Sequence, residues 1–121
     1  MNESQQLKKL TSQLIKASEY LLETFQRVKE TGNEEDFYTI VRPFANEMKE
    51  MNDSWNVLAK EWIKKNQPDY LNARQIDSAS DHIEIISIQA FFPQTSKKRF
   101  LDSYKSVLFI LQTMQKELTI E

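Results

Sequence analysis

The sequence has little of what most catalytic and binding sites are built from. Its 121 residues include no cysteine, one glycine, three prolines and one histidine. Without cysteine, disulfides, thiolate catalysis and zinc–thiolate sites are excluded. A single glycine excludes the glycine-rich loops that hold phosphates. Because hairpins need turn residues, the same shortage favours a few long helices over strands.

Long apolar runs are also missing. No stretch approaches the roughly 20 residues that a membrane span needs, and the segment Met1-Asn2-Glu3-Ser4-Gln5-Gln6 lacks the apolar run of a signal peptide. The net charge of −2 does not favour a phosphate backbone as partner. We therefore expect a cytoplasmic protein, with neither a membrane nor a nucleic acid among its partners.

The most regular pattern in the chain runs from Phe37 to Trp62. Its large apolar residues alternate steps of four and three, which is a seven-residue repeat that lays one apolar seam along a helix. They are Phe37, Val41, Phe44, Met48, Met51, Trp55, Leu58 and Trp62. The rest of the chain reads as helices that cover this seam.

Three further seams have the same helical spacing, over Leu7–Val28, Ile76–Ala90 and Phe100–Leu118. Additional apolar residues, Ile85 and Ile88 among them, widen these stripes to the breadth that a bundle helix needs. The isoleucines make a strand the rival interpretation of residues 83–88. The helical spacing continues on both sides of that run, so we predict a helix.

Capping residues predict the helix ends. The first helix should span Glu3–Thr31, with Gly32 as its left-handed C-terminal cap. Asn72, with Gln75 three residues later, predicts the start of the third helix, which Pro93 ends. Thr95 or Ser96 should cap the last helix, which runs to about Leu118.

Proline interrupts the second seam. Asn33 can cap a short helix over residues 34–42, and Pro43 removes a backbone hydrogen bond inside the apolar repeat. We expect a kink or break there, followed by a helix over residues 43–66. The predicted fold is all-α: an up-down-up-down antiparallel four-helix bundle, one domain over residues 1–121, with helix 2 kinked or broken near Pro43. Its seams contain no charged residue, so we expect an apolar core.

The sequence gives little support for a metal site or for general acid–base catalysis. A di-iron bundle needs Glu-x-x-His on two helices, whereas this chain has only His82 and no such motif. Carboxylate pairs such as Glu19 with Glu23 and Glu47 with Glu50 lie off the apolar stripe, where ordinary pKa values are expected. We predict no catalytic residue, no metal and no cofactor, and thus a protein that is not an enzyme.

The candidate functional residues are Lys97, Lys98 and Arg99, the basic run. Three cations at a helix start oppose the helix dipole. One interpretation is an intramolecular charge cluster with Glu30, Glu34, Glu35 and Asp36, which the bundle brings to the same end. The other is a surface that binds an anion or an acidic partner.

Leftover apolar surface is a second feature of interest. Phe91 precedes Pro93 near a bundle end, where it could be exposed, and Tyr38 lies outside the seam. Either residue could support a dimer, so we expect a monomer or a weak homodimer.

Several short stretches of the chain match a known pattern in order and spacing. They are Asp36-Phe37-Tyr38, Arg42-Pro43-Phe44, Gln67-Pro68-Asp69-Tyr70, Gln75-Ile76, Lys97-Lys98-Arg99-Phe100 and Ser106-Val107-Leu108. Together they resemble the YppE-like family of small uncharacterised bacterial proteins. The resemblance covers most of the chain from Asp36 onward. It implies a four-helix bundle and brings no activity, substrate or catalytic residue.

These observations favour a non-enzymatic interaction or regulatory module whose partner is another protein. The alternative is a small-ligand or anion-binding bundle that uses the basic run. A closed core supports the first hypothesis, whereas a deep cavity with converging polar groups supports the second.

Overall fold

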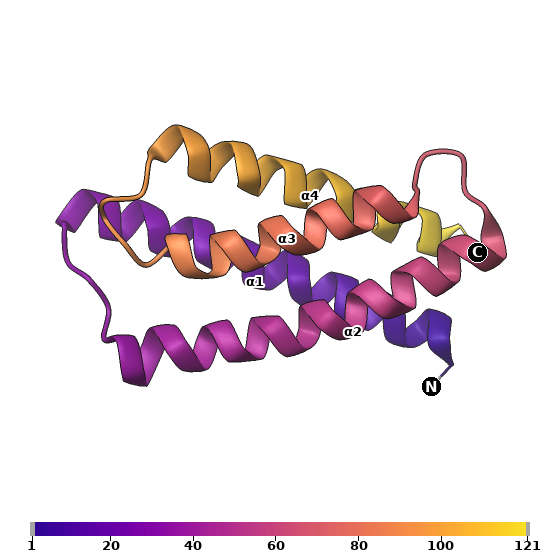
Figure 1. The fold of residues 1–121 in the computed structure, drawn as a ribbon, viewed down its shortest axis with the longest axis horizontal. Helices are drawn as coiled ribbons and strands as arrows, with labels where there is room; N and C mark the ends of the chain where they lie inside the picture. The colour runs from indigo at the N-terminus through magenta and orange to yellow at the C-terminus, as the bar shows by residue number, and fades with distance from the viewer. Residues whose placement is uncertain (1, 121) are drawn as a thin grey trace.

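Four long helices form an antiparallel bundle in the computed structural model, which describes residues 2–120 (Figure 1). They are α1 (Glu3–Thr31), α2 (Arg42–Asn66), α3 (Ala73–Gln89) and α4 (Lys97–Thr119). Each helix packs on its neighbours in the chain, and α4 returns to pack on α1. The predicted all-α up-down-up-down fold is confirmed. Met1 and Glu121, the ends of the predicted domain, lie outside the described residues.

Three helix ends follow the predicted capping residues, whereas α3 ends at Gln89, before the predicted stop at Pro93. Gly32 closes α1 with φ 72°, and its N–H donates to the Val28 carbonyl. Asn72 and Gln75 form a reciprocal capping box at the start of α3. Of the two candidates for α4, Ser96 is the cap, since its hydroxyl accepts from the Arg99 N–H.

The start of α2 differs from the predicted short helix over residues 34–42. Asp36, not Asn33, is the cap, and it opens a π-helix, η1 (Phe37–Val41), that leads directly into α2. The predicted break near Pro43 is thus this single turn of π-helix, called the π-turn below, with Pro43 in the first turn of α2. A π-turn bonds each N–H one residue further back, which relieves the clash of the proline ring with the preceding turn.

The core lies along the four seams. On the central seam Val41, Met48, Trp55 and Trp62 are buried, while Phe37 is exposed. The buried residues of segment 2–120 include no Asp, Glu, Lys, Arg or His. The core is not wholly apolar, however, because five small polar residues are buried in it: Thr11, Ser18, Thr24, Asn52 and Ser87.

Aromatic side chains fill the end of the bundle near the α3–α4 connection. Phe25 of α1 stacks on Phe100 of α4, with ring centroids 4.2 Å apart. Phe91 is 1% exposed and lies edge-on to Phe44, 5.7 Å away. The expectation that Phe91 could be exposed is therefore wrong, because the turn after α3 folds its ring inward against α2.

Candidate functional site

The basic run begins α4 and is fully on the surface. Lys97, Lys98 and Arg99 are all exposed. Lys98 pairs with Asp102 one turn later, Nζ to Oδ2 3.2 Å. Within residues 2–120, the side chains of Lys97 and Arg99 form no ion pair. Two cations at a helix start are left to solvent or to an external anion.

Three of the four acids expected to neutralise the basic run have other partners. Glu35 pairs with Arg27 at 2.8 Å, which raises the pKa of the Arg27 guanidinium. Glu34 accepts a hydrogen bond from the Gln94 amide at 3.2 Å. Among residues 2–120, none of the four acids forms an ion pair with the basic run, so the predicted charge cluster is not formed there.

The Asp36 side chain binds backbone N–H groups instead of the basic run. One of its carboxylate oxygens accepts from the N–H groups of Thr39 at 2.8 Å and Tyr38 at 3.0 Å. These bonds, that to Thr39 first, lower the pKa of the Asp36 carboxyl. The Asp36 side chain is therefore the N-terminal cap of η1.

A groove between α2 and α3, which we call the α2–α3 groove, is a candidate site that the sequence analysis missed. Its volume is about 550 Å³, within the range of small-ligand sites. Apolar and polar side chains of both helices line it: Ala45, Asn46, Met48, Lys49, Asn52, Asp81, Ile83, Glu84, Ile85, Ser87 and Ile88.

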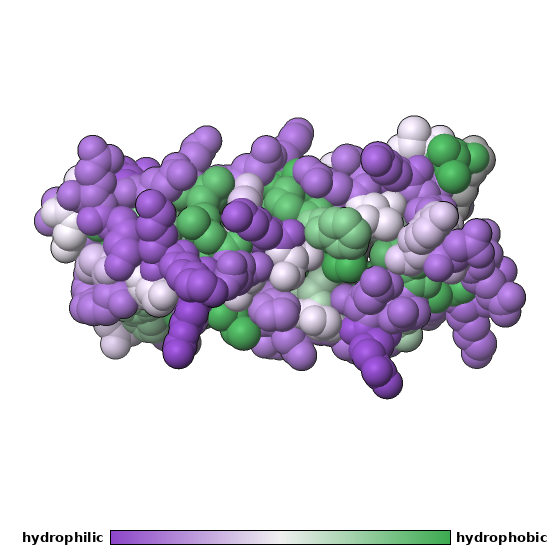
Figure 2. All heavy atoms as spheres, turned by 90° about the horizontal axis from the view of Figure 1, so that it is seen from above, coloured by the Kyte–Doolittle hydropathy of each residue, from purple (hydrophilic) through white to green (hydrophobic). Residues whose placement is uncertain are grey.

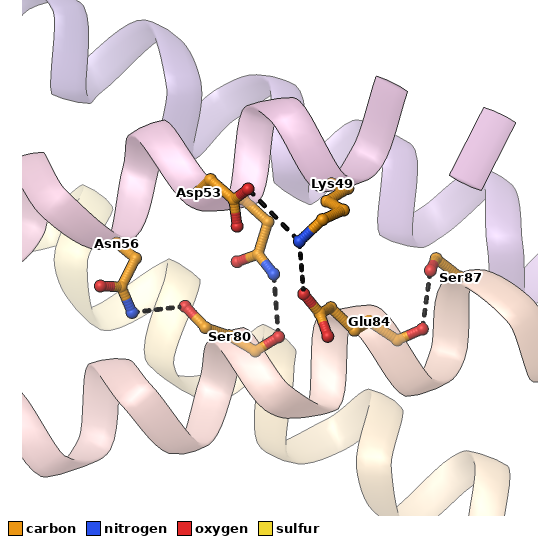
Figure 3. Close-up of polar contacts among 7 residues, drawn as sticks. Lys49, Asp53, Asn56, Ser80, Glu84 and Ser87 are labelled. Carbon is orange, nitrogen blue, oxygen red and sulfur yellow. Dashed lines mark hydrogen bonds and ion pairs between the residues drawn. The ribbon is translucent and has the colours of Figure 1, made fainter. Parts of the chain in front are cut away.

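An ammonium bridges the two helices at this groove. The Lys49 Nζ lies 3.4 Å from the Asp53 carboxylate on its own helix and 3.5 Å from Glu84 across the gap (Figure 3). The two carboxylates, Asp53 first, raise the pKa of Lys49. The side chain of Asp81, which also lines the groove, forms no hydrogen bond or ion pair with another residue of the 2–120 segment.

Amide side chains extend this polar contact along the two helices. Asn56 Nδ2 donates to Ser80 Oγ at 2.9 Å and to Asp77 Oδ1 at 3.0 Å (Figure 3 draws the first). Lys60 also donates to Asp77, at 2.8 Å. Lys60 and then Asn56 lower the pKa of the Asp77 carboxyl.

Asn52 is the most buried polar group of the groove, at 2% exposure. Its Nδ2 donates to the Ser80 carbonyl at 2.9 Å. Its Oδ1 accepts no hydrogen bond from the residues that the structure describes. An unpaired buried acceptor costs about 1–3 kcal/mol, so a donor that reaches this oxygen is stabilising.

A sequence signal for the groove existed. Asp81, Glu84, Ile85 and Ile88 are spaced as one helical stripe. Helical spacing predicts Ile85 and Ile88 in a widened core stripe, yet each is 42% exposed. The prediction failed because the true core stripe of α3 is narrower, passing through Ile76, Ile83 and Ile86.

A second apolar surface lies where the α2–α3 connection meets the end of α4. Tyr70, Phe109 and Ile120 are 75%, 64% and 79% exposed and border a groove of about 750 Å³. We call these three residues the terminal apolar surface. On the face shown in Figure 2, hydrophobic side chains emerge in separate patches between hydrophilic ones, one of them at the end that holds the termini.

The one histidine lies outside these features. His82 is half-buried, and its Nδ1 has no hydrogen-bond partner within the described part of the chain. Between residues 2 and 120, no three His, Asp or Glu side chains gather in a way that could hold a metal. No helix of that segment is long and apolar enough to cross a membrane.

Comparison with known proteins gives consistent matches over nearly the whole chain. The model of a bacterial domain of unknown function, DUF1798, matches residues 11–118. The uncharacterized protein YppE of Bacillus subtilis (strain 168) is 30% identical over 118 residues, or 98% of this chain and 96% of that protein.

Solved structures agree with the fold. The crystal structure of Bacillus subtilis YppE matches with a TM-score of 0.93 at 30% identity, over 98% of this chain and 96% of that one. A crystal structure of a protein of unknown function from Listeria innocua matches with a TM-score of 0.91 at 29% identity, over 97% and 94%.

Proposed function

Since the chain belongs to the DUF1798 family of bacterial proteins of unknown function, we propose that it acts as a non-enzymatic protein-interaction module in the cytoplasm. Membership of this family implies no activity for the chain, so the proposal depends on the chain's own surface. Its partner is another protein, and the chain is a monomer or a weak homodimer when unbound.

The terminal apolar surface is the observation that carries this proposal. Tyr70, Phe109 and Ile120 leave most of their side-chain area in water although the bundle core is filled without them. Exposed aromatic side chains that gather around a groove are typical of surfaces that bind a partner. The core supports the same proposal, because no ionisable side chain of residues 2–120 is buried there to act as a catalytic group.

Parallel affinity capture with three baits tests the proposal. A protein retained by the wild type should be lost with Phe109→Ser and retained with Val57→Ser. Val57 is a suitable control because it is 56% exposed on α2, away from the terminal apolar surface. Equal capture by all three baits, with folding intact, would contradict the assignment of this surface.

The second candidate is anion binding by the basic run. It is favoured by one observation: Lys97 and Arg99 have no side-chain ion pair in the segment 2–120. Backbone N–H groups at the start of α4 add to these charges. A phosphorylated ligand should bind the wild type and not a folded Lys97/Lys98/Arg99 triple alanine variant. Equal binding by both proteins rejects this candidate.

A further inference from the structure

We propose that the α2–α3 groove binds a small amphipathic organic cation, with its charged group at Asp81 and Glu84 and its apolar part along Ile85 and Ile88. This site differs from the terminal apolar surface and from the basic run, and it does not depend on either. Its ligand also has the opposite charge from the anion that the basic run would take.

The geometry of the groove favours an elongated ligand. The stripe from Asp81 to Ile88 spans two turns of α3, with its charged residues at one end and its isoleucines at the other. Met48 and Ile83 are buried groove residues that supply an apolar base. A ligand laid along this stripe meets carboxylates first and hydrocarbon next.

The charges of the groove favour a cation over an anion. Asp81 has no partner in the described chain, and Glu84 only shares Lys49 with Asp53. Lys49 is the one cation among the lining residues, and its ammonium is already held by two carboxylates. An incoming ammonium therefore finds unneutralised carboxylate, whereas an incoming carboxylate is repelled.

Hydrogen-bonding groups point to the same ligand class. Asn52 has an unpaired Oδ1, and the Ser87 hydroxyl gives its proton to the Glu84 carbonyl at 2.7 Å. Both groups therefore offer acceptors rather than donors to a ligand. An ammonium or guanidinium group, which is donor-only, complements them.

The test uses three probes of equal chain length: hexylammonium, hexanoate and hexanol. Each is titrated into the ¹⁵N-labelled full chain while backbone amide shifts are followed. We expect saturable shifts at α2 and α3 residues of the groove, strongest for hexylammonium and weakest for hexanoate. No saturation, equal binding of hexanoate, or shifts confined to Tyr70, Phe109 and Ile120 would overturn the proposal.

Two charge variants make the test specific. Asp81→Asn with Glu84→Gln should weaken hexylammonium binding about threefold to tenfold relative to hexanol. Lys49→Gln removes the competing ammonium and should strengthen it about twofold to fivefold. Weaker hexylammonium binding by Lys49→Gln overturns the proposal, because the loss of a positive charge can only favour a cation that binds at these carboxylates.

A matched control separates local from global charge effects. Lys98 and Asp102 form an exposed pair on α4 with the same four-residue spacing as Lys49 and Asp53. Asp102→Asn should leave hexylammonium affinity unchanged. The Asp81/Glu84 variant removes two charges and the control removes one, so a loss of about half as much binding free energy would show that only net charge matters. All these side chains are exposed, so thermal unfolding of each variant should match the wild type.

Discussion

Trp55 and Thr11 join α2 to α1 by a hydrogen bond inside the core. The indole Nε1 of Trp55 donates to the Thr11 hydroxyl oxygen at 3.1 Å, and that hydroxyl donates to the Leu7 carbonyl at 2.7 Å. Trp55 and Thr11 are both fully buried. One hydroxyl therefore satisfies a tryptophan that could not otherwise be buried without a penalty.

Thr11→Val should destabilise the protein by about 1–3 kcal/mol, because it leaves the buried indole N–H unpaired. Urea unfolding followed by circular dichroism measures the loss. A double-mutant cycle with Trp55→Phe, which removes the donor, should give a coupling energy of about 1 kcal/mol. Strictly additive effects of the two substitutions would show that the bond contributes nothing.

Gly32→Ala should cost about 1 kcal/mol through backbone conformation alone. Gly32 has φ 72°, and a Cβ added there would meet nothing within 4 Å. Gly32→Asn is the matched variant, since asparagine tolerates the left-handed region and should cost less. Thermal unfolding of the two variants gives the comparison, and equal stability of Gly32→Ala and the wild type would refute the cap.

Gln67→Gly should stabilise the protein by about 0.5–1 kcal/mol. Gln67 closes α2 with φ 45°, a conformation that glycine adopts without strain. The neighbouring substitution Asn66→Gly, inside the last turn of α2, should instead destabilise it. Denaturant midpoints of the two variants should therefore move in opposite directions, and a shared direction would contradict the capping role.

Asp36 should make the stability of the start of α2 depend on pH in the acidic range. Its folded-state pKa lies below the ordinary value of 3.8, because the Thr39 and Tyr38 N–H groups stabilise the carboxylate. The unfolded chain therefore takes up the proton first as pH falls. The stabilisation is complete above the unfolded pKa and is lost as pH falls through the folded pKa.

Carboxyl NMR titration of the folded protein measures this shift directly. In Asp36→Asn, which keeps an oxygen acceptor, unfolding between about pH 6 and pH 2 should lose this part of its pH dependence. A midpoint for Asp36 at or above that of a carboxyl in an unstructured peptide would contradict the cap geometry.

The helices were predictable because their signals are local. Gly32, Asn72 and Ser96 act on backbone groups within a few residues, and apolar spacing fixes which face turns inward. The π-helix at Phe37–Val41 was not predictable in the same way. The apolar spacing favours one continuous helix through this segment, whereas Pro43 favours a break, and sequence alone does not show which geometry satisfies both.

The candidate sites depend on pairing between helices, which spacing does not determine. The basic run was found from sequence, yet two of its four expected acidic partners bind Arg27 and Gln94 instead. The α2–α3 groove was missed because Ile85 and Ile88 satisfy the same helical spacing whether they are buried or line a groove. Only the position of α2 decides between those two cases.

Xenon binding followed by methyl NMR tests most directly the claim that the bundle interior is closed and that any binding takes place at the surface. Xenon enters apolar cavities that water leaves empty. Methyl groups of the buried residues Leu14, Leu21, Ile86 and Leu111, none of which lines a groove described above, should show no saturable shift. Saturable shifts at those four residues would reveal an internal cavity and contradict the account.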